Sequence, residues 1–294
     1  MTIWTMIVQT IVNGSLTGGV YALIAVGITI IFGVMRMVNF ASGAYLAVGM
    51  YMGYLAYVLT GWNTYLLIPL VIVFCSVIAL VTYRFCIEPV LGKGSSTSAL
   101  LVTIGLSFAL QNLLNIVFGT DPVNIPNDVS GASFKVGIFT IGIPRLIAFA
   151  FAIGLVIVVF IFINKTKFGR EMRATSEKKE VAEMLGINTR RVFMISWTIG
   201  ITLTGIGGLL VTPLYYIQPS AGATFRTTAI VAVVLGGLGD IRGALISGIF
   251  LGVIEALCAL LVASDLGQLG IFVAYLLVLY LKPQGLFGKG ERVA

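Results

Sequence analysis

Long apolar runs separated by short polar breaks dominate the sequence. A helix needs about 20 mostly apolar residues to cross a bilayer. Eight runs are interpreted as full spans, at residues 6–33, 38–59, 65–87, 99–118, 144–164, 192–217, 244–263 and 268–281. A ninth run, residues 227–239, is short for a full span, so we expect a broken or re-entrant helix there. The pattern predicts an all-α integral membrane protein, a polytopic helix bundle forming a single transmembrane domain over residues 1–294.

The composition excludes the soluble classes of protein. Hydrophobic residues make up 59% of the chain and charged residues 10%, whereas soluble domains carry about 25% charged residues. The net charge of +7 therefore indicates basic loops beside anionic lipid and no nucleic-acid partner. The chain has no histidine, and Cys75, Cys86 and Cys258 lie singly in apolar stretches, so neither a metal site nor a disulfide is expected.

The basic residues predict an orientation. Arg36 is the first charge beside the first run, and alternating sides along the chain puts 15 of the 18 basic residues on one side. Lys135, Arg145 and Arg226 fall on the other side. Because basic loops face the cytoplasm, we expect the N-terminus outside and the C-terminus inside. This requires residues 227–239 to return the chain to the inner side.

Two loops stand out from the other connections. The outer loop, residues 119–143, contains turn residues followed by an alternating apolar run, which predicts a small cap that includes a hairpin. Its turn residues are Asp121, Pro122, Pro126, Asp128 and Gly131, and its alternating residues are Phe134, Val136 and Ile138. The inner loop, residues 165–191, is the longest charged segment of the chain.

The inner loop predicts an amphipathic helix over residues 170–185. Met172, Val181, Met184 and Leu185 form its apolar stripe, while charged residues at 177–180 face water. Ser176 is the expected cap of a second helical piece, and Gly186 the expected residue of positive φ after its end. Such a helix is either a connector lying on lipid or a docking element whose apolar face enters a groove on a cytoplasmic partner.

Polar residues within the spans are candidates for a translocation path or for contacts between helices, and the sequence leaves both open. Thr103, Ser107, Gln111 and Asn115 follow one another at i, i+4 spacing and share a helix face; Asn39 and Ser42 begin the second span. Glu255 is the only acidic residue deep in a span, and it either serves transport or makes a structural hydrogen bond.

Four pairs of glycines have the G-x-x-x-G spacing that lets helices approach closely. They are Gly14 with Gly18, Gly49 with Gly53, Gly239 with Gly243, and Gly248 with Gly252. Packing is the first interpretation of these pairs, and a moving gate is the second. No phosphate-binding loop is present, because the lysines at residues 93 and 289 are not followed by a hydroxyl residue.

Several motifs resemble a known family. Residues 180–186 match E-x-A-x-x-x-G, which resembles the EAA loop of ABC importer permeases. Residues 39–43 (NFASG) resemble the N-F-A-H-G signature of the LivH group of branched-chain amino-acid permeases. The stretches at 168–174, 185–188, 235–244 and 283–288 resemble that group in the same order. Ser42 stands where the group has histidine, and Asp240-Ile241-Arg242 replaces its usual S-I-P.

The resemblance implies a permease subunit of an ATP-driven ABC importer in the bacterial inner membrane, and not an enzyme. The implied partners are a second permease (a relative or a second copy), two ATPases that hold ATP and Mg, and an extracytoplasmic solute-binding protein that docks on residues 121–135. The expected solute is a branched-chain amino acid; urea, short amides and aromatic acids are alternatives. A lone ion-coupled secondary transporter that uses Glu255 is the rival class.

The candidate residues then take three roles. Those expected to couple to the ATPase are Arg170, Arg173, Glu180, Ala182, Leu185 and Gly186. Those expected along the translocation pathway are Asn39, Ser42, Thr103, Ser107, Gln111, Asn115 and Glu255. Those expected in gating or packing are Gly236, Gly237, Gly239 and Gly243.

Overall fold

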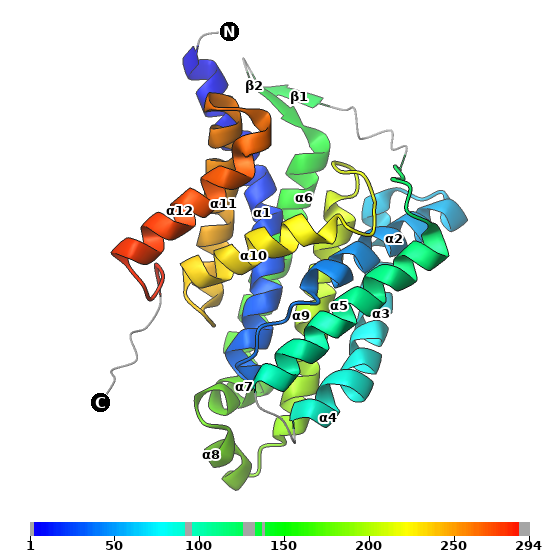
Figure 1. Cartoon of the computed structure of the whole chain (residues 1–294), viewed down its shortest axis with the longest axis vertical. Coiled ribbons are helices and arrows are strands. Elements are labelled where there is room, and N and C mark those ends of the chain that lie inside the picture. Colours follow the sequence, from blue (N-terminus) through cyan, green and yellow to red (C-terminus); the bar gives the residue numbers. More distant parts are fainter. Residues whose placement is uncertain (1–2, 92–95, 126–132, 137–138, 288–294) are drawn as a thin grey trace.

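The computed structural model describes residues 3–91, 96–125, 133–136 and 139–287. It contains helices joined by short turns and one small hairpin (Figure 1). In chain order the elements are α1 (Ile3–Met35), α2 (Ser42–Thr60), η1 (Thr64–Leu67), α3 (Ile68–Thr82), η2 (Tyr83–Ile87), α4 (Glu88–Leu91), α5 (Ser96–Phe118), β1 (Ser133–Val136), β2 (Phe139–Gly142), α6 (Ile143–Lys165), α7 (Lys167–Glu177), α8 (Lys179–Met184), α9 (Thr189–Val211), α10 (Gly222–Gly236), α11 (Ile241–Leu261), η3 (Ser264–Leu266) and α12 (Gly267–Leu281).

The predicted all-helical, polytopic bundle is confirmed. Among the described residues, seven helices are long and apolar enough to cross a membrane, and the third of them runs continuously from η1 to α4. The short run expected at 227–239 forms α10, which has 15 residues. The last run, expected as a full span, forms α12, which also has only 15 residues. The predicted eight full spans therefore become seven long helices and two short ones.

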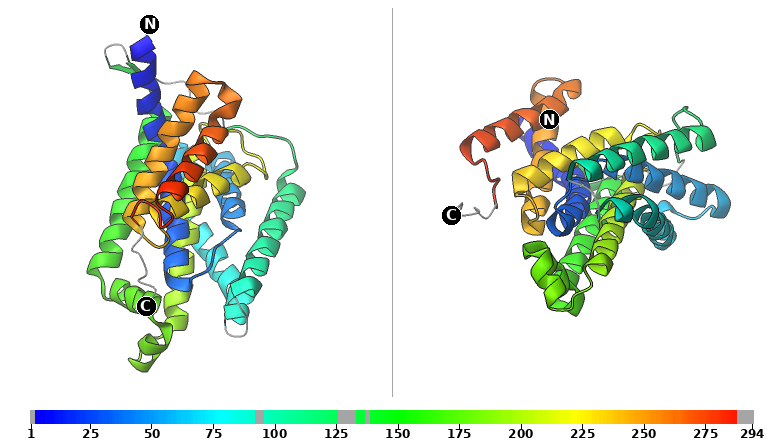
Figure 2. Two further views of the ribbon diagram at one scale, coloured as in Figure 1. Left: turned by 60° about the vertical axis from the view of Figure 1, so that its left-hand side comes forward. Right: turned by 60° about the horizontal axis from the view of Figure 1, so that its bottom comes forward.

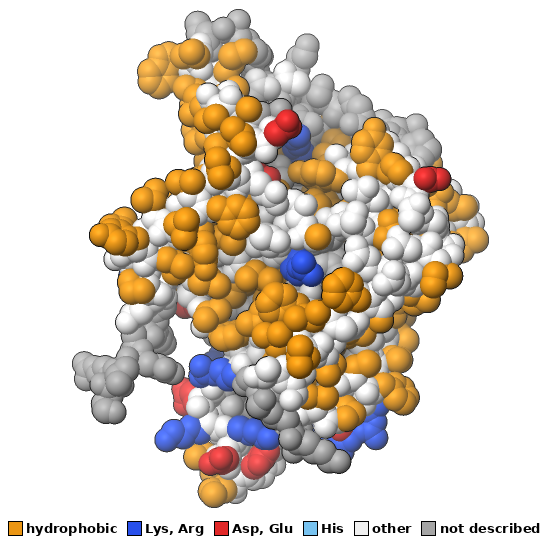
Figure 3. Space-filling model, viewed as in Figure 1, with side chains coloured by type: hydrophobic (Ala, Val, Ile, Leu, Met, Phe, Trp, Pro, Cys, Tyr) orange, Lys and Arg blue, Asp and Glu red, His pale blue; other side chains and the backbone are white. Residues whose placement is uncertain are grey.

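The core of the bundle surrounds α1. This helix packs against α11, α9, α6 and α10, and 89% of its most apolar stretch is buried. In α5 the corresponding share is 11%, so most of its apolar side chains face outward. On the face shown in Figure 3, hydrophobic side chains cover much of the surface, and Lys and Arg gather near its lower end. Outward apolar side chains suit contact with lipid or with another membrane subunit.

Glycines lie where helices cross most closely. A Cβ added to Gly14 would lie 2.7 Å from the carbonyl oxygen of Gly252, and one added to Gly18 would lie 2.7 Å from the Cα of Ile249. The first and last G-x-x-x-G pairs of the sequence thus face each other across the α1–α11 crossing. Gly43 of α2 meets Gly222 of α10 in the same way.

The outer loop forms the predicted hairpin. β1 pairs with β2 in antiparallel register, with Ser133 opposite Gly142. Pro126, Asp128, Gly131 and Ile138 lie outside the described residues. Figures 1 and 2 place this hairpin at the end of the molecule opposite α7 and α8.

Candidate functional site

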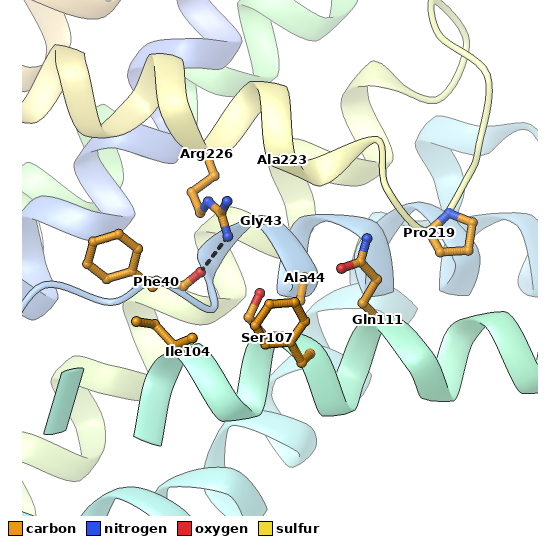
Figure 4. A pocket seen from close by; sticks show the side chains of 10 residues that line it. Phe40, Gly43, Ala44, Ile104, Ser107, Gln111, Pro219, Ala223 and Arg226 are labelled. Atoms are coloured by element: carbon orange, nitrogen blue, oxygen red, sulfur yellow. Dashed lines mark hydrogen bonds between the residues drawn. The ribbon is translucent and has the colours of Figure 1, made fainter. Parts of the chain in front are cut away.

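A cavity of about 270 Å³ lies where α2, α5 and α10 meet (Figure 4). Ser107 and Gln111 of α5 line it on one side, and Arg226 of α10 on another. The other lining residues are Phe40, Gly43, Ala44, Ile104, Phe108, Pro219 and Ala223. The cavity is therefore mostly apolar, with a few polar groups, as is usual for sites that bind small molecules.

The turn between α1 and α2 lines the cavity at Phe40. The Phe40 N–H donates to the Thr103 hydroxyl oxygen at 3.3 Å, and the Phe40 carbonyl accepts from the Arg226 guanidinium at 3.2 Å. The Asn39 side-chain oxygen accepts from the Ala41 N–H at 2.9 Å, and the Ser42 hydroxyl donates to the Asn39 carbonyl at 3.2 Å. Asn39, Ser42 and Thr103 thus hold the turn in shape.

The structure therefore divides the predicted pathway residues into those that line the cavity and those that do not. Ser107 and Gln111 line the cavity, whereas Asn39, Ser42 and Thr103 are buried behind it. Asn115 lies one turn beyond Gln111 on α5 and does not line the cavity. Sequence reasoning missed Arg226, because a charge beside a short apolar run was interpreted as an outer flank. The helix begins earlier than this run, at Gly222, so Arg226 lies inside α10.

Glu255 lies in a different place. It lines a second cavity of about 490 Å³, together with Asn13, Arg145, Asp265 and Gln268, that shares no lining residue with the first. The Tyr21 side chain of α1 lies beside the Glu255 carboxylate. The structure thus separates Glu255 from Ser107 and Gln111. Among the described residues, no cluster of three or more His, Cys, Asp or Glu side chains is placed to hold a metal ion.

The inner loop forms two helices, α7 and α8. α7 begins at a Thr166 cap, whose hydroxyl oxygen accepts from the Gly169 N–H at 3.1 Å. Arg173 donates to the Ile163 carbonyl at 2.9 Å and to the Asn164 side-chain oxygen at 3.0 Å, so it fastens α7 to the end of α6. Arg173, expected to meet an ATPase, makes these contacts within its own chain.

The break between the two helices falls at Lys178, which has extended backbone angles. The expectation that Ser176 caps the second piece is wrong, because its hydroxyl donates back to the Arg173 carbonyl at 2.8 Å and α8 begins later. The expected positive φ of Gly186 is confirmed at +80°. The Gly186 N–H donates to the Glu183 carbonyl and closes α8.

α8 presents an apolar tip outward. Met184 is 85% exposed and Leu185 75% exposed, and Val181 beside them is half-exposed. Arg170, Glu180 and Gly186 are exposed as well. Ala182 is only 1% exposed and faces its own chain. Apolar side chains at the charged end of the molecule need a partner surface or lipid to cover them.

Polar contacts connect α8 to the nearby ends of α4 and α9. Glu88 of α4 pairs with Arg84 at 2.8 Å and with Arg190 of α9. The Thr189 hydroxyl donates to the Glu183 carboxylate of α8 at 2.6 Å. These contacts join α4, α8 and α9 into one unit.

Arg36 connects α7 to the turn at the cavity. It follows the end of α1, and its guanidinium donates to the Ser176 carbonyl of α7 at 3.0 Å. Its φ of +54° is the one positive value at a non-glycine position within the described ranges. Such a conformation is unfavourable for an L-residue and is retained where surrounding contacts impose it.

Comparison with known proteins gives consistent results. The family described as "Branched-chain amino acid transport system / permease component" matches residues 10–281. The chain is 33% identical to the high-affinity branched-chain amino acid transport system permease protein LivH of Escherichia coli K12, over 96% of each chain. It is 32% identical to LivH of Salmonella typhimurium and 31% identical to BraD of Pseudomonas aeruginosa, again over 96% of each chain.

Proposed function

The chain belongs to the family of permease components of branched-chain amino acid transport systems, and on that premise we propose that it is the permease subunit of an ATP-driven ABC importer. The chain is a multi-pass membrane protein. The importer moves branched-chain amino acids inward across the cytoplasmic membrane. Its ATP and Mg are bound by separate ATPase subunits.

The observation that carries this proposal is the exposed apolar tip of α8. α8, whose tip carries the exposed Met184 and Leu185, lies at the end of the molecule opposite the hairpin (Figure 1), beside the charged residues of the inner loop. A short amphipathic helix of this kind docks its apolar face in a groove of a partner. An ATPase subunit that closes on ATP would push α7 and α8, and the contacts to α4, α9 and Arg36 pass that movement to the membrane helices.

The position of the first cavity supports a pathway shared with a second permease. The cavity lies beside α5, whose surface is the least buried of the long helices. A second permease, either a relative or a second copy, would cover this surface and complete the pathway. A binding protein would deliver solute at the outer end, where the hairpin lies.

Transport by the purified complex tests the proposal. We expect ATP-dependent uptake of leucine by liposomes that contain this chain, its co-purified partners and the binding protein, and no uptake with a non-hydrolysable ATP analogue. Uptake driven by an ion gradient without ATP would overturn the proposal in favour of a secondary transporter. Uptake of urea in place of leucine would overturn the assigned solute but not the importer class.

Labelling of single cysteines tests the orientation. With Cys75, Cys86 and Cys258 replaced by serine, we expect Trp62→Cys, after α2, to react with a membrane-impermeant maleimide in intact cells. Lys178→Cys, between α7 and α8, should react only after the membrane is opened, because the basic inner loop faces the cytoplasm. Both residues are exposed in the structure. The reverse pattern would contradict the proposed N-out, C-in orientation.

A further inference from the structure

We propose that Arg226 binds the carboxylate of the transported solute in the cavity between α2, α5 and α10. The inference rests on the proposed transport function, and it goes beyond that function by assigning the charged contact that selects the class of solute.

The first argument is the charge of Arg226. A guanidinium has five N–H donors, and the structure gives it one hydrogen bond, to the neutral Phe40 carbonyl. The ion pairs between described residues involve Arg84, Lys179 and Arg190, and none involves Arg226. No described residue that lines the cavity is acidic. A positive charge among apolar helices is costly, and such residues face the bundle interior or a water-filled cavity and mark substrate pathways.

The second argument is the position of the guanidinium. Figure 4 shows the Arg226 side chain reaching from α10 toward Phe40, with Ser107 and Gln111 on α5 across the cavity. A Cβ on Gly43 would lie 3.1 Å from the Cβ of Arg226, so the glycine leaves room for this side chain to enter. The hydrogen bond to Phe40 holds one nitrogen, and the other donors remain for a ligand.

The third argument is the chemistry of the remaining surface. The cavity volume of about 270 Å³ is close to the lower end of small-molecule sites, about 300–1,000 Å³. Ile104 and Phe108 provide apolar surface for an aliphatic side chain, and Ser107 and Gln111 provide oxygen acceptors for an ammonium group. An arginine pairs a carboxylate through two parallel hydrogen bonds. Urea or a neutral amide would leave the charge of Arg226 without a counter-ion.

Equilibrium binding to the intact complex in nanodiscs, without the binding protein, tests the assignment. The probes are radiolabelled leucine and leucinamide, in which a neutral amide replaces the carboxylate. We expect the wild type to bind leucine at least tenfold more tightly than leucinamide. Arg226→Gln should weaken leucine binding at least tenfold and bind the two probes alike, and Arg226→Lys should restore part of the preference.

Arg145→Gln is the matched control, because Arg145 lines the second cavity and not this one. It should keep the wild-type preference. The ratio between the two probes matters most, because a merely structural defect would weaken both equally. If Arg226→Gln keeps the wild-type ratio, or if the wild type has no preference, the inference is wrong.

Three further outcomes identify the reason for a failure. Loss of the second permease from purified Arg226→Gln, with the ratio unchanged, would assign Arg226 to a contact between subunits and overturn the inference. If the wild-type complex transports no leucine in the liposome assay, the proposed solute fails, and the inference fails with it. Normal leucine transport by the wild type together with an unchanged ratio in Arg226→Gln overturns the inference alone.

Discussion

Gly252→Leu is expected to separate α1 from α11 and to remove most of the folded protein from the membrane. A Cβ at Gly252 would lie 2.5 Å from the Gly14 carbonyl oxygen, which is part of the helix backbone and cannot rotate away. Overpacking a core costs about 1–3 kcal/mol even where side chains can adjust. We therefore expect Gly252→Leu to lower the free energy of unfolding by at least the upper end of this range. The free energy of unfolding should fall accordingly, measured as a loss of thermal stability in detergent.

Gly154→Leu is the control for this substitution. Gly154 lies within α6, also in an apolar helix, and a Cβ there would contact nothing within 4 Å. The control should be extracted as a single species with wild-type thermal stability. If Gly252→Leu is as stable as Gly154→Leu, the α1–α11 crossing is not as closely packed as described.

The double variant Met184→Glu/Leu185→Glu is expected to abolish ATP-dependent uptake while the protein remains inserted and folded. Both side chains are exposed, so the change removes a docking surface and disturbs no packing within the chain. Dominant side chains of an interface contribute about 2 kcal/mol each. Loss of both would weaken ATPase binding by about a thousandfold, measured as recovery of the ATPase with the purified permease.

Glu177→Gln is the control for the docking surface, since Glu177 is exposed on the same loop at the end of α7. It should keep normal uptake and normal ATPase binding. Substitution of Ala182, which the E-x-A-x-x-x-G motif suggests, is less informative because that residue is buried against its own chain. Unchanged ATP-dependent uptake by the inserted double variant would exclude α8 as the docking element.

Much of the fold could be predicted because lipid imposes a simple rule on sequence. Spans must be apolar and helical, so hydropathy alone located the long helices. The glycine motifs predicted that some helices pack closely, but they do not show which helix packs against which. The contact of Gly14 and Gly18 with Gly248 and Gly252 depends on the arrangement of the whole bundle.

The candidate site was predictable only in part. Ser107 and Gln111 were found because polar residues four positions apart share a helix face. Asn39, Ser42 and Thr103 looked the same in the sequence, but their hydrogen bonds are used within the turn. Arg226 was missed because a hydropathy pattern treats a charge as the edge of a span. The second helical piece was expected after a Ser176 cap, whereas the break falls at Lys178 and α8 begins at Lys179.

The turn that contains Arg36 and Phe40 acts as a tether between α7 and the cavity. Arg36 holds α7 at the Ser176 carbonyl, and Phe40 holds α5 and α10. Only four peptide units separate them, so their Cα atoms cannot move more than about 14 Å apart. Movement of α7 beyond the slack of this tether must either break the Arg36 bond or pull the main chain of Phe40 away from Arg226. Force generated at the inner surface would thereby reach the cavity along the backbone.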